Sequence, residues 1–260
     1  MPEKLCEPKL GEILDFCAEA PVERVLLEDM ARRRLGAFRA LKRGRRLTAL
    51  CHAGVNVVPA GDGCAAFASL LSRDRARMVL GEDRAVSGLW SAACAHMPEP
   101  RADRPGQPVF VLEKPPSAGD SGLRPAREDD LERLLPACAA AHRQELGVDP
   151  LARDAEAFRA RTRAQIVEGR SWLWLEGDVI LFKAEASALT PCAVQLQQVW
   201  TDPAARRQGC ASRGLRDLCR ALLACSSAVC LFVRTENEAA IRLYETIGMR
   251  RAGSYRSLLF

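Results

Sequence analysis

Histidine is scarce in this chain, and the cysteines are not spaced like metal ligands. The 260 residues include three histidines, His52, His96 and His142, and eleven cysteines, none of which forms a C-x-x-C pair. A structural zinc site needs four such ligands and is usually marked by short spacings, so we expect no bound metal. Most of the cysteines lie inside apolar stretches such as AVCLFV at 228–233, which predicts reduced thiols in the core.

Long apolar runs are also missing. No uninterrupted run approaches the roughly 20 apolar residues that a membrane-spanning helix needs. The first residues, MPEKLCEPKLGEILDF, lack the apolar segment of a secretory signal, so we expect a cytoplasmic protein with no membrane partner. Hydrophobic residues make up 48% of the chain and charged residues 27%, which suits one large or two modest globular domains.

The excess of positive charge is small. A formal net charge of +5 favours a solvated, arginine-rich surface, with attraction to an anionic ligand as the alternative. The strongest basic patch, ALKRGRRL at 40–47, has no interleaved aromatic residues, and no nucleic-acid-binding motif accompanies it. We therefore expect no nucleic acid as partner.

Proline and glycine are concentrated between residues 98 and 122. Inside this stretch, VFVLEK at 109–114 is the only segment with strand character. A linker near 115–122 is therefore the best boundary. It predicts an N-terminal domain over 1–117 and a C-terminal domain over 118–260.

The C-terminal domain alternates between strand and helix patterns. Apolar periodicity predicts strands near 122–126, 171–178, 179–189, 193–200, 228–233 and 253–260, and helices near 127–144, 153–168, 211–223 and 237–247. Strands that first meander and then alternate with helices predict an α/β fold of the α+β kind, with a mixed sheet.

The sequence DPAARRQGCA lies between the predicted strand at 193–200 and the helix at 211–223. Free backbone N–H groups at a helix start carry partial positive charge, Gly209 lets a ligand approach the backbone, and Arg206 and Arg207 add full charges. Such a loop suits a pyrophosphate, although an ordinary helix start would look similar. It is neither a P-loop, since no Gly-Lys-Ser/Thr follows, nor a dinucleotide fingerprint, since it has one glycine.

Two segments resemble the cofactor motifs of the GNAT superfamily of N-acetyltransferases. VWTDPAARRQGCA is similar to the acetyl-CoA motif Gln/Arg-x-x-Gly-x-Gly/Ala that follows the fourth strand, with Arg206, Gly209 and Ala211 in those places. VCLFVRTENEAAIRLYETIGMRRAGSY resembles the second motif, a strand followed by Asn-x-x-Ala and a helix with Leu-Tyr-x-x-x-Gly-Phe, with Met249 replacing the phenylalanine. The resemblance implies a GNAT fold over 118–260 and acetyl-CoA as co-substrate.

The resemblance also implies which residues bind the cofactor. The loop and helix start would hold the pyrophosphate through Arg206, Arg207, Gln208, Gly209, Cys210, Ala211 and Ser212. In the superfamily the fourth and fifth strands splay apart. The main chains of Val199 and Thr201 would therefore pair with the pantetheine amides as though pantetheine were a strand.

Asn237 and Tyr244 both lie on the predicted helix 237–247. Seven residues at 100° each bring them within about 20° of one another on one helix face, so both can face one extended ligand. By the resemblance, Asn237 would bond the pantetheine region, while Tyr244 would lie beside the sulfur and act as the general acid. The alternatives are a helix N-cap for Asn237 and a core aromatic for Tyr244.

A general base is harder to place, because AVQLQQVW carries no carboxylate where many family members keep a glutamate. Glu185, on the preceding strand, is the nearest replacement. The alternative is a solvent-facing strand residue paired with Lys183, which shares its face of the strand. A base acting through water, or water alone, is also open.

The N-terminal domain repeats the C-terminal pattern faintly. LTALCHAGVNVVPAG predicts a strand pair, AGDGCAAFASLL is similar to RRQGCASRGLRDL, and MVLGEDRAVSGLWSAA is similar to CLFVRTENEAAIRLYETI. Ala60 stands in place of Arg206, Asp62 would repel a pyrophosphate, and Trp90 replaces Tyr244. These changes predict a smaller, degenerate and inactive GNAT-like domain. The whole chain is similar to two-domain bacterial acetyltransferases with an uncharacterised N-terminal domain.

The resemblance therefore implies an N-acetyltransferase that moves an acetyl group from acetyl-CoA to a primary amine. The acceptor is unidentified, and a small molecule, a protein N-terminus or a lysine would each fit. A non-catalytic acetyl-CoA-binding module, with an N-terminal domain that contacts a protein, is the alternative. A nucleic-acid binder working through residues 40–47 is a second rival, which a steep salt dependence of binding would reveal.

Overall fold

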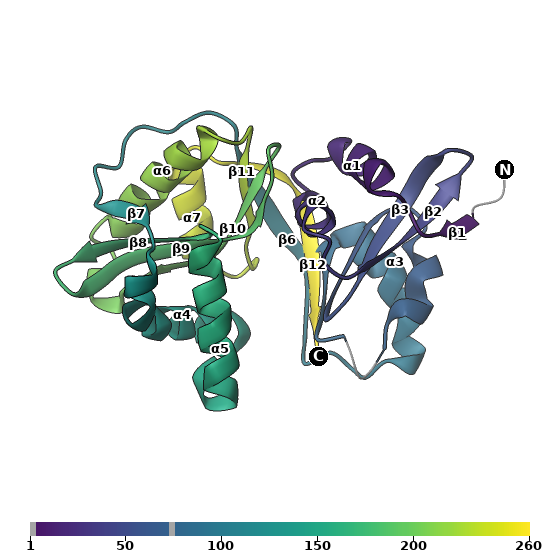
Figure 1. Ribbon diagram of the computed structural model, residues 1–260, viewed down its shortest axis with the longest axis horizontal. Coiled ribbons are helices and arrows are strands. Elements are labelled where there is room, and N and C mark those ends of the chain that lie inside the picture. The colour runs from purple at the N-terminus through teal and green to yellow at the C-terminus, as the bar shows by residue number, and fades with distance from the viewer. Residues whose placement is uncertain (1–3, 73–75) are drawn as a thin grey trace. The chain divides into compact units, whose positions relative to one another are not determined.

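The computed structural model describes residues 4–72 and 76–260 and divides the chain into two compact units (Figure 1). The first unit comprises Met1–Val111, Phe232–Ile241 and Arg250–Phe260, and the second comprises Leu112–Leu231 and Arg242–Met249. Each unit combines helices with a sheet of mixed strand direction, as the sequence predicts. Within the described ranges, no helix is long and apolar enough to cross a membrane.

The first unit is built around the strand order β1-β2-β3-β4-β5-β12-β6, in which β4 and β5 are parallel and the other neighbours antiparallel. Its elements are β1 (Lys4–Cys6), α1 (Leu10–Ala18), α2 (Val25–Arg32), β2 (Ala37–Arg43), β3 (Arg46–Ala53), β4 (Asn56–Gly61), η1 (Cys64–Leu70), β5 (Met78–Glu82), α3 (Asp83–Ala93), η2 (Cys94–His96), β6 (Ala102–Leu112), the first half of α7 (Glu238–Thr246) and β12 (Arg250–Leu259).

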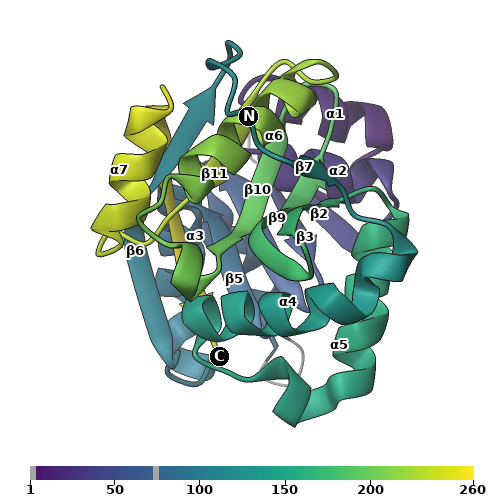
Figure 2. The ribbon, with the colours of Figure 1, turned by 90° about the vertical axis from the view of Figure 1, so that its left-hand side faces the viewer.

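The second unit has the strand order β7-β8-β9-β10-β11, in which β10 and β11 are parallel. Its elements are β7 (Leu123–Pro125), η3 (Glu128–Asp130), α4 (Leu131–Leu146), α5 (Pro150–Val167), β8 (Ser171–Glu176), β9 (Val179–Leu189), β10 (Val194–Thr201), η4 (Pro203–Ala205), α6 (Cys210–Leu223), β11 (Val229–Phe232) and the second half of α7 (Glu238–Thr246). Helices α4 and α6 lie on opposite faces of this sheet, and α5 packs against α4 (Figures 1 and 2).

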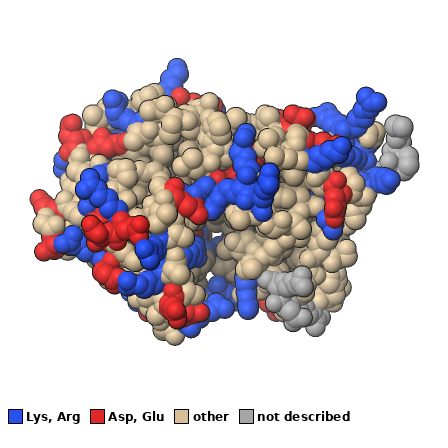
Figure 3. Space-filling model, viewed as in Figure 1, with Lys and Arg blue, Asp and Glu red and all other residues tan. Residues whose placement is uncertain are grey.

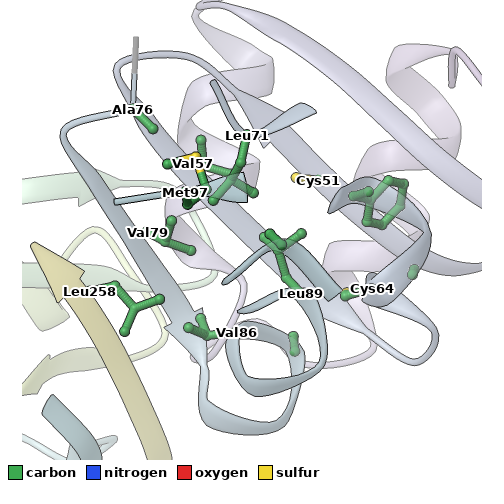
Figure 4. Packing of buried hydrophobic residues seen from close by; sticks show 14 of the residues in the cluster. Cys51, Val57, Cys64, Leu71, Ala76, Val79, Val86, Leu89, Met97 and Leu258 are labelled. Atoms are coloured by element: carbon green, nitrogen blue, oxygen red, sulfur yellow. The ribbon is translucent and has the colours of Figure 1, made fainter. Parts of the chain in front are cut away.

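The last strand of the chain completes the sheet of the first unit. β12 pairs antiparallel with β5 through Leu258↔Val79 and with β6 through Leu258↔Asp103. Leu258 joins the buried cluster that also holds Phe67, Val79 and Leu89 (Figure 4). A single cut after residue 117 therefore differs from the observed units, because long-range strand pairing carries a C-terminal segment into the first one.

The strand predicted at 109–114 is longer than its sequence suggests. β6 begins at Ala102 and runs through Pro105 and Gly106, where its pairing with β12 shifts register. Gly106 has a φ of +65°, and a bulge of this kind accommodates a proline that cannot donate to the ladder. Proline and glycine here mark a bulge inside a strand, whereas residues 113–122 lie outside helices and strands.

The core of the second unit lies between its sheet and α4. Leu134 and Cys138 of α4, Phe158 of α5, Leu173 of β8 and Trp200 of β10 pack in one buried cluster. Cys138 is one of seven buried cysteines among the eleven of the chain. All eleven are free thiols, as predicted. Cys94 and Cys225 are the two exposed exceptions.

Acidic and basic side chains are interspersed on the visible surface of each unit (Figure 3). The basic patch at 40–47 belongs to this mixture. Lys42 lies 2.5 Å from a carboxylate oxygen of Glu12, and Arg46 lies 2.9 Å from Glu19. These ion pairs, with Glu12 of α1 and with its C-cap residue Glu19, reduce the positive field of the patch, which weakens the case for a nucleic-acid surface there.

Candidate cofactor-binding and active site

The loop between β10 and α6 is shaped by its own backbone. Asp202 accepts a hydrogen bond from the Ala204 N–H at 2.8 Å and starts the short turn η4. Arg207 and Gly209 then adopt left-handed φ values of +63° and +80°. Glycine tolerates this conformation freely, whereas an arginine there is uncommon. Gly209 is the N-cap residue of α6, so the loop leads directly into the helix.

The first N–H groups of α6 have no partner within the helix and lie next to an exposed loop. The N–H of Arg213 bonds the carbonyl of Gly209 at 3.0 Å, which makes the N–H groups of Cys210, Ala211 and Ser212 the ones that precede internal helix bonding. Residues 206–209 are exposed. Partial charge on these N–H groups, together with two arginines, gives a site that suits a phosphate.

Two loop side chains bond the backbone near them. The Nε of Arg206 donates to the carbonyl of Thr201 at 3.3 Å, and the Nε2 of Gln208 donates to the carbonyl of Ala204 at 2.8 Å. The contact of Arg206 occupies part of the predicted pantetheine site, because Thr201 is one of the two residues whose main chain is expected to pair with pantetheine. A pantetheine amide bonded to this carbonyl would have to use its second lone pair or displace Arg206.

β10 parts from its parallel neighbour after two residue pairs. Its register with β11 consists of Val194↔Val229 and Gln195↔Cys230, although β10 continues to Thr201. The rest of β10 is bent by a bulge against β9, since Gln197 pairs with Glu185 and Trp200 with Lys183. Within the described residues of this unit, the register of β10 with β11 thus ends at Gln195, well before the end of β10, and an extended ligand could pair with the main chain of the later residues.

The bulge has an unusual residue at its centre. Gln198 has a φ of +48°, and Gln198 and Val199 together oppose the single residue Ala184. A left-handed non-glycine residue marks a conformation that its neighbours impose. Nothing in the local sequence signals this bulge, because it contains neither glycine nor proline.

Tyr244 is buried on α7, with 6% of its surface exposed. Burial raises the pKa of its hydroxyl above the ordinary tyrosine value, and the nearby Glu145 carboxylate and Cys219 add to the effect. The hydroxyl is therefore protonated at neutral pH, which a general acid requires. Burial is equally compatible with the alternative reading as a core aromatic.

Asn237 caps α7. Its Oδ1 accepts a hydrogen bond from the Ala240 N–H at 3.2 Å, and its carbonyl accepts one from Ile241 at 3.0 Å. The predicted N-cap role is confirmed. The cap uses the side-chain oxygen, whereas the predicted contact to pantetheine would use the Nδ2 donors, so the two roles are chemically compatible.

Glu185 is buried rather than solvent-facing. Its side chain is 7% exposed, and its Oε1 lies 2.5 Å from the Nζ of Lys183, which is itself 1% exposed. Burial opposes ionisation of Glu185, but the charge and hydrogen bond of Lys183 outweigh it and hold the pKa of the carboxyl below its usual value. The predicted pairing with Lys183 is present, and the predicted solvent exposure is wrong. Whether Glu185 acts as a base stays a prediction.

Two residues with no functional signal in the sequence, Cys138 and Gln198, complete the surroundings of this ion pair. Lys183 donates to the Sγ of Cys138 at 3.1 Å and to the Oε1 of Gln198 at 3.2 Å. One signal was present, namely a lysine inside the apolar strand LFKAEA. A buried charge needs partners from other elements, and their identity depends on tertiary structure.

Residues 113–122 are fastened along α6 (Figure 1). Asp217 accepts hydrogen bonds from the N–H groups of Gly119 and Ser121 at 2.7 and 2.8 Å and from the Ser121 hydroxyl at 2.6 Å. Arg213 donates to the carbonyl of Gly119 at 2.9 Å, and Arg220 donates to that of Pro116 at 2.9 Å. The predicted linker is therefore a strap on the helix that begins at the candidate phosphate loop.

The first unit repeats the plan of the second. In chain order each half has a strand, two helices, three strands, a helical segment, a strand, a helix and a strand. β4 and β5 are parallel through two residue pairs, as β10 and β11 are. Gly63 caps η1 in a left-handed conformation with a φ of 87°, as Gly209 caps α6. The predicted degenerate copy of the fold is confirmed, with a seven-residue 3₁₀ segment where the second unit has a fourteen-residue helix.

In the first unit, contacts of the chain itself occupy the space where β4 and β5 separate. The N–H of Gly61 donates to the Oε2 of Glu82 at 3.1 Å, and Arg24 donates to the Oε1 of Glu82 at 2.9 Å. A Cβ on Gly81 would lie 2.7 Å from the carbonyl oxygen of Pro59, so the two backbones approach closely there. Gly61 lies four residues beyond Val57, the last residue of β4 paired with β5, as Val199 lies four residues beyond Gln195, and the Glu82 carboxylate accepts the Gly61 N–H.

Two family models match separate parts of the chain. Residues 36–134 match the domain of unknown function DUF4081, and residues 181–257 match the FR47-like protein family. The second match includes Glu185, the loop between β10 and α6, and Tyr244. No curated protein matches the sequence.

Solved structures match the whole chain at low identity. A protein assigned to the GNAT acetyltransferases, from Novosphingobium aromaticivorans, is 19% identical over 92% of this chain and 97% of its own, with a TM-score of 0.56. A GNAT-family acetyltransferase from Colwellia psychrerythraea is 11% identical over 100% of both chains, with a TM-score of 0.59. A tandem GNAT protein of clavulanic acid biosynthesis is 11% identical over 99% of this chain and 98% of its own, with a TM-score of 0.55. The chain therefore has the fold of the GNAT acetyltransferases, carried twice, and its second copy is similar to the FR47-like family.

Proposed function

We propose that the second unit binds acetyl-CoA and transfers its acetyl group to a primary amine. The observation that carries this proposal is the combination of an arginine-flanked helix start with exposed residues at 206–209 and a β10 segment that continues beyond the end of its register with β11. A phosphate site and an adjacent strand edge together suit a ligand with a pyrophosphate at one end and an amide-containing arm.

In this proposal the loop and β10 divide the binding between them. The N–H groups of Cys210, Ala211 and Ser212, with Arg206, Arg207 and Gln208, would hold the pyrophosphate. The main chains of Val199 and Thr201 would pair with the pantetheine amides. The first unit offers no equivalent edge, because the N–H of Gly61 is already bonded to Glu82.

The chemistry needs two proton transfers. The amine nitrogen forms a bond to the acetyl carbonyl carbon, the carbon–sulfur bond breaks, and the departing thiolate takes the hydroxyl proton of Tyr244. The nitrogen loses a proton to a base. Glu185 is our proposed base, and water is the alternative, which the lowered pKa of this buried carboxylate favours.

The acceptor is proposed only as a class, namely a primary amine of a small molecule, a protein N-terminus or a lysine. A non-catalytic acetyl-CoA-binding module remains the second candidate, because Glu185 is engaged by Lys183 and is a weak base. Both candidates predict binding of acetyl-CoA, and they differ in turnover.

Free-thiol release measured with a panel of amines tests the choice between them. We expect acetyl-CoA to bind in a calorimetric titration and thiol release to rise above the protein-free rate with at least one amine. Binding without release for any amine would favour the binding module, and absence of binding would remove both candidates.

A further inference from the structure

We propose that the buried Lys183–Glu185 ion pair is a clamp that holds the β10 bulge and thereby positions the thioester end of the bound ligand. The inference rests on the proposed function, and it assigns a positioning role to two residues of β9. Its basis is the set of contacts that the pair makes with β10 and α4.

Every donor of Lys183 has an acceptor. A lysine ammonium has three N–H donors. Here its Nζ lies 2.5 Å from the Oε1 of Glu185, 3.1 Å from the Sγ of Cys138 and 3.2 Å from the Oε1 of Gln198. These partners come from β9, α4 and β10, so one buried charge ties three elements together. With 1% of its side chain exposed, Lys183 cannot exchange these contacts for water without opening the core.

The pair also spans the bulge along β10. Glu185 is the register partner of Gln197 and accepts a weak hydrogen bond from its Nε2 at 3.4 Å, while Lys183 is the register partner of Trp200. Gln198 lies between them in a left-handed conformation that side chains disfavour. Its side chain is bonded to Lys183, which opposes relaxation of the bulge into a regular strand.

Packing alone does not require an ion pair at this place. A buried pair can often be replaced by apolar residues of similar volume without loss of stability. The pair forms hydrogen bonds with Gln197 and Gln198 of β10. Both residues lie between Gln195, the last residue paired with β11, and Thr201, the last residue of the strand. The clamp therefore acts on the stretch whose main-chain groups face the ligand.

The test compares two ligands in the full chain. Acetyl-CoA reaches the bulge, whereas 3′-phospho-ADP has the pyrophosphate but no pantetheine arm. The key variant, Lys183→Met combined with Glu185→Leu, removes both charges with similar volume. The control, Arg124→Met, opens another ion pair of the same unit, in which Asp130 is similarly buried.

We expect the double variant to lose on the order of tenfold in affinity for acetyl-CoA, the scale of one or two hydrogen bonds, and to keep its affinity for 3′-phospho-ADP. The control should bind both ligands like the parent. Amide hydrogen exchange at Gln198 and Val199 should also become faster in the double variant.

Three results would count against these ideas. Unchanged acetyl-CoA affinity and exchange in the double variant would overturn the clamp alone. Parallel loss of both ligands by a variant that still unfolds cooperatively would also overturn it, because the effect would not be confined to the bulge. A parent protein that binds neither ligand would instead overturn the proposed function.

Discussion

Replacing Asp217 should lower the free energy of unfolding, because this residue fastens the strap of residues 113–122 to α6. Its carboxylate accepts three hydrogen bonds from Gly119 and Ser121. In Asp217→Asn the amide keeps one acceptor, but its Nδ2 group would face a backbone N–H donor. Hydrogen bonds to a charged group contribute about 1.5 to 3 kcal/mol each, and Asp217 is partly exposed, so we expect a net loss of about 2 kcal/mol.

Urea denaturation of the full chain at neutral pH measures this loss as a lower midpoint. Asp178→Asn is the matched control, since Asp178 pairs with Arg133 at 2.9 Å but its side chain is 88% exposed. Exposed ion pairs contribute little, so the control should stay within about 0.5 kcal/mol of the parent. Equal midpoints for Asp217→Asn and the control would show that the strap does not stabilise the second unit.

The pH dependence of the same variant gives an independent check. Burial opposes ionisation of Asp217, but hydrogen bonds from Ser121 and Gly119 outweigh it and lower the pKa of the carboxyl. A lowered pKa in the folded state adds stability above the unfolded-state pKa, about 3.9, which is lost as the pH falls through the folded-state value. The gap between parent and Asp217→Asn should therefore be constant near neutrality and shrink below about pH 4.

Four further predictions concern the ligand and the two units. Arg206→Ala should weaken acetyl-CoA binding by about 1 to 3 kcal/mol, the scale of a charge-assisted hydrogen bond, and an unchanged calorimetric Kd would place the pyrophosphate elsewhere. Tyr244→Phe keeps the ring, so affinity should hold while turnover in the thiol-release assay falls by about 10²-fold, and parental turnover would make the tyrosine a packing residue. Calorimetry should give one acetyl-CoA site per chain, because Glu82 closes the edge of the first unit, and two equivalent sites would contradict that closure. Deletion of 250–260 removes β12 from the sheet of the first unit and should lower its melting temperature, so an unchanged melt would refute the pairing with β5.

The sequence by itself determined the parts of this protein that depend on neighbouring residues. Loop composition between a strand and a helix located the arginine-flanked start of α6, and glycine at 209 answers a local need for a left-handed φ of 80°. The N-cap at Asn237 is likewise local, since its acceptor and donor lie three residues apart. The degenerate first copy could be predicted because Gly63 keeps the position of Gly209 while the arginines that precede Gly209 have no counterpart.

Only the tertiary structure decided which distant segments meet. The pairing of β12 with β5 and β6 draws the chain's end into the first unit, and strand order has no local sequence signature. Sheet register brings Lys183, Glu185 and Gln198 together. The nearby ammonium of Lys183 then holds the pKa of the buried Glu185 carboxyl below its usual value. Glu82 closes the first unit in the same way, through a contact with Gly61 across two strands. The reason is physical, because a buried charge or an open main-chain group takes its partner from whichever element the fold places beside it.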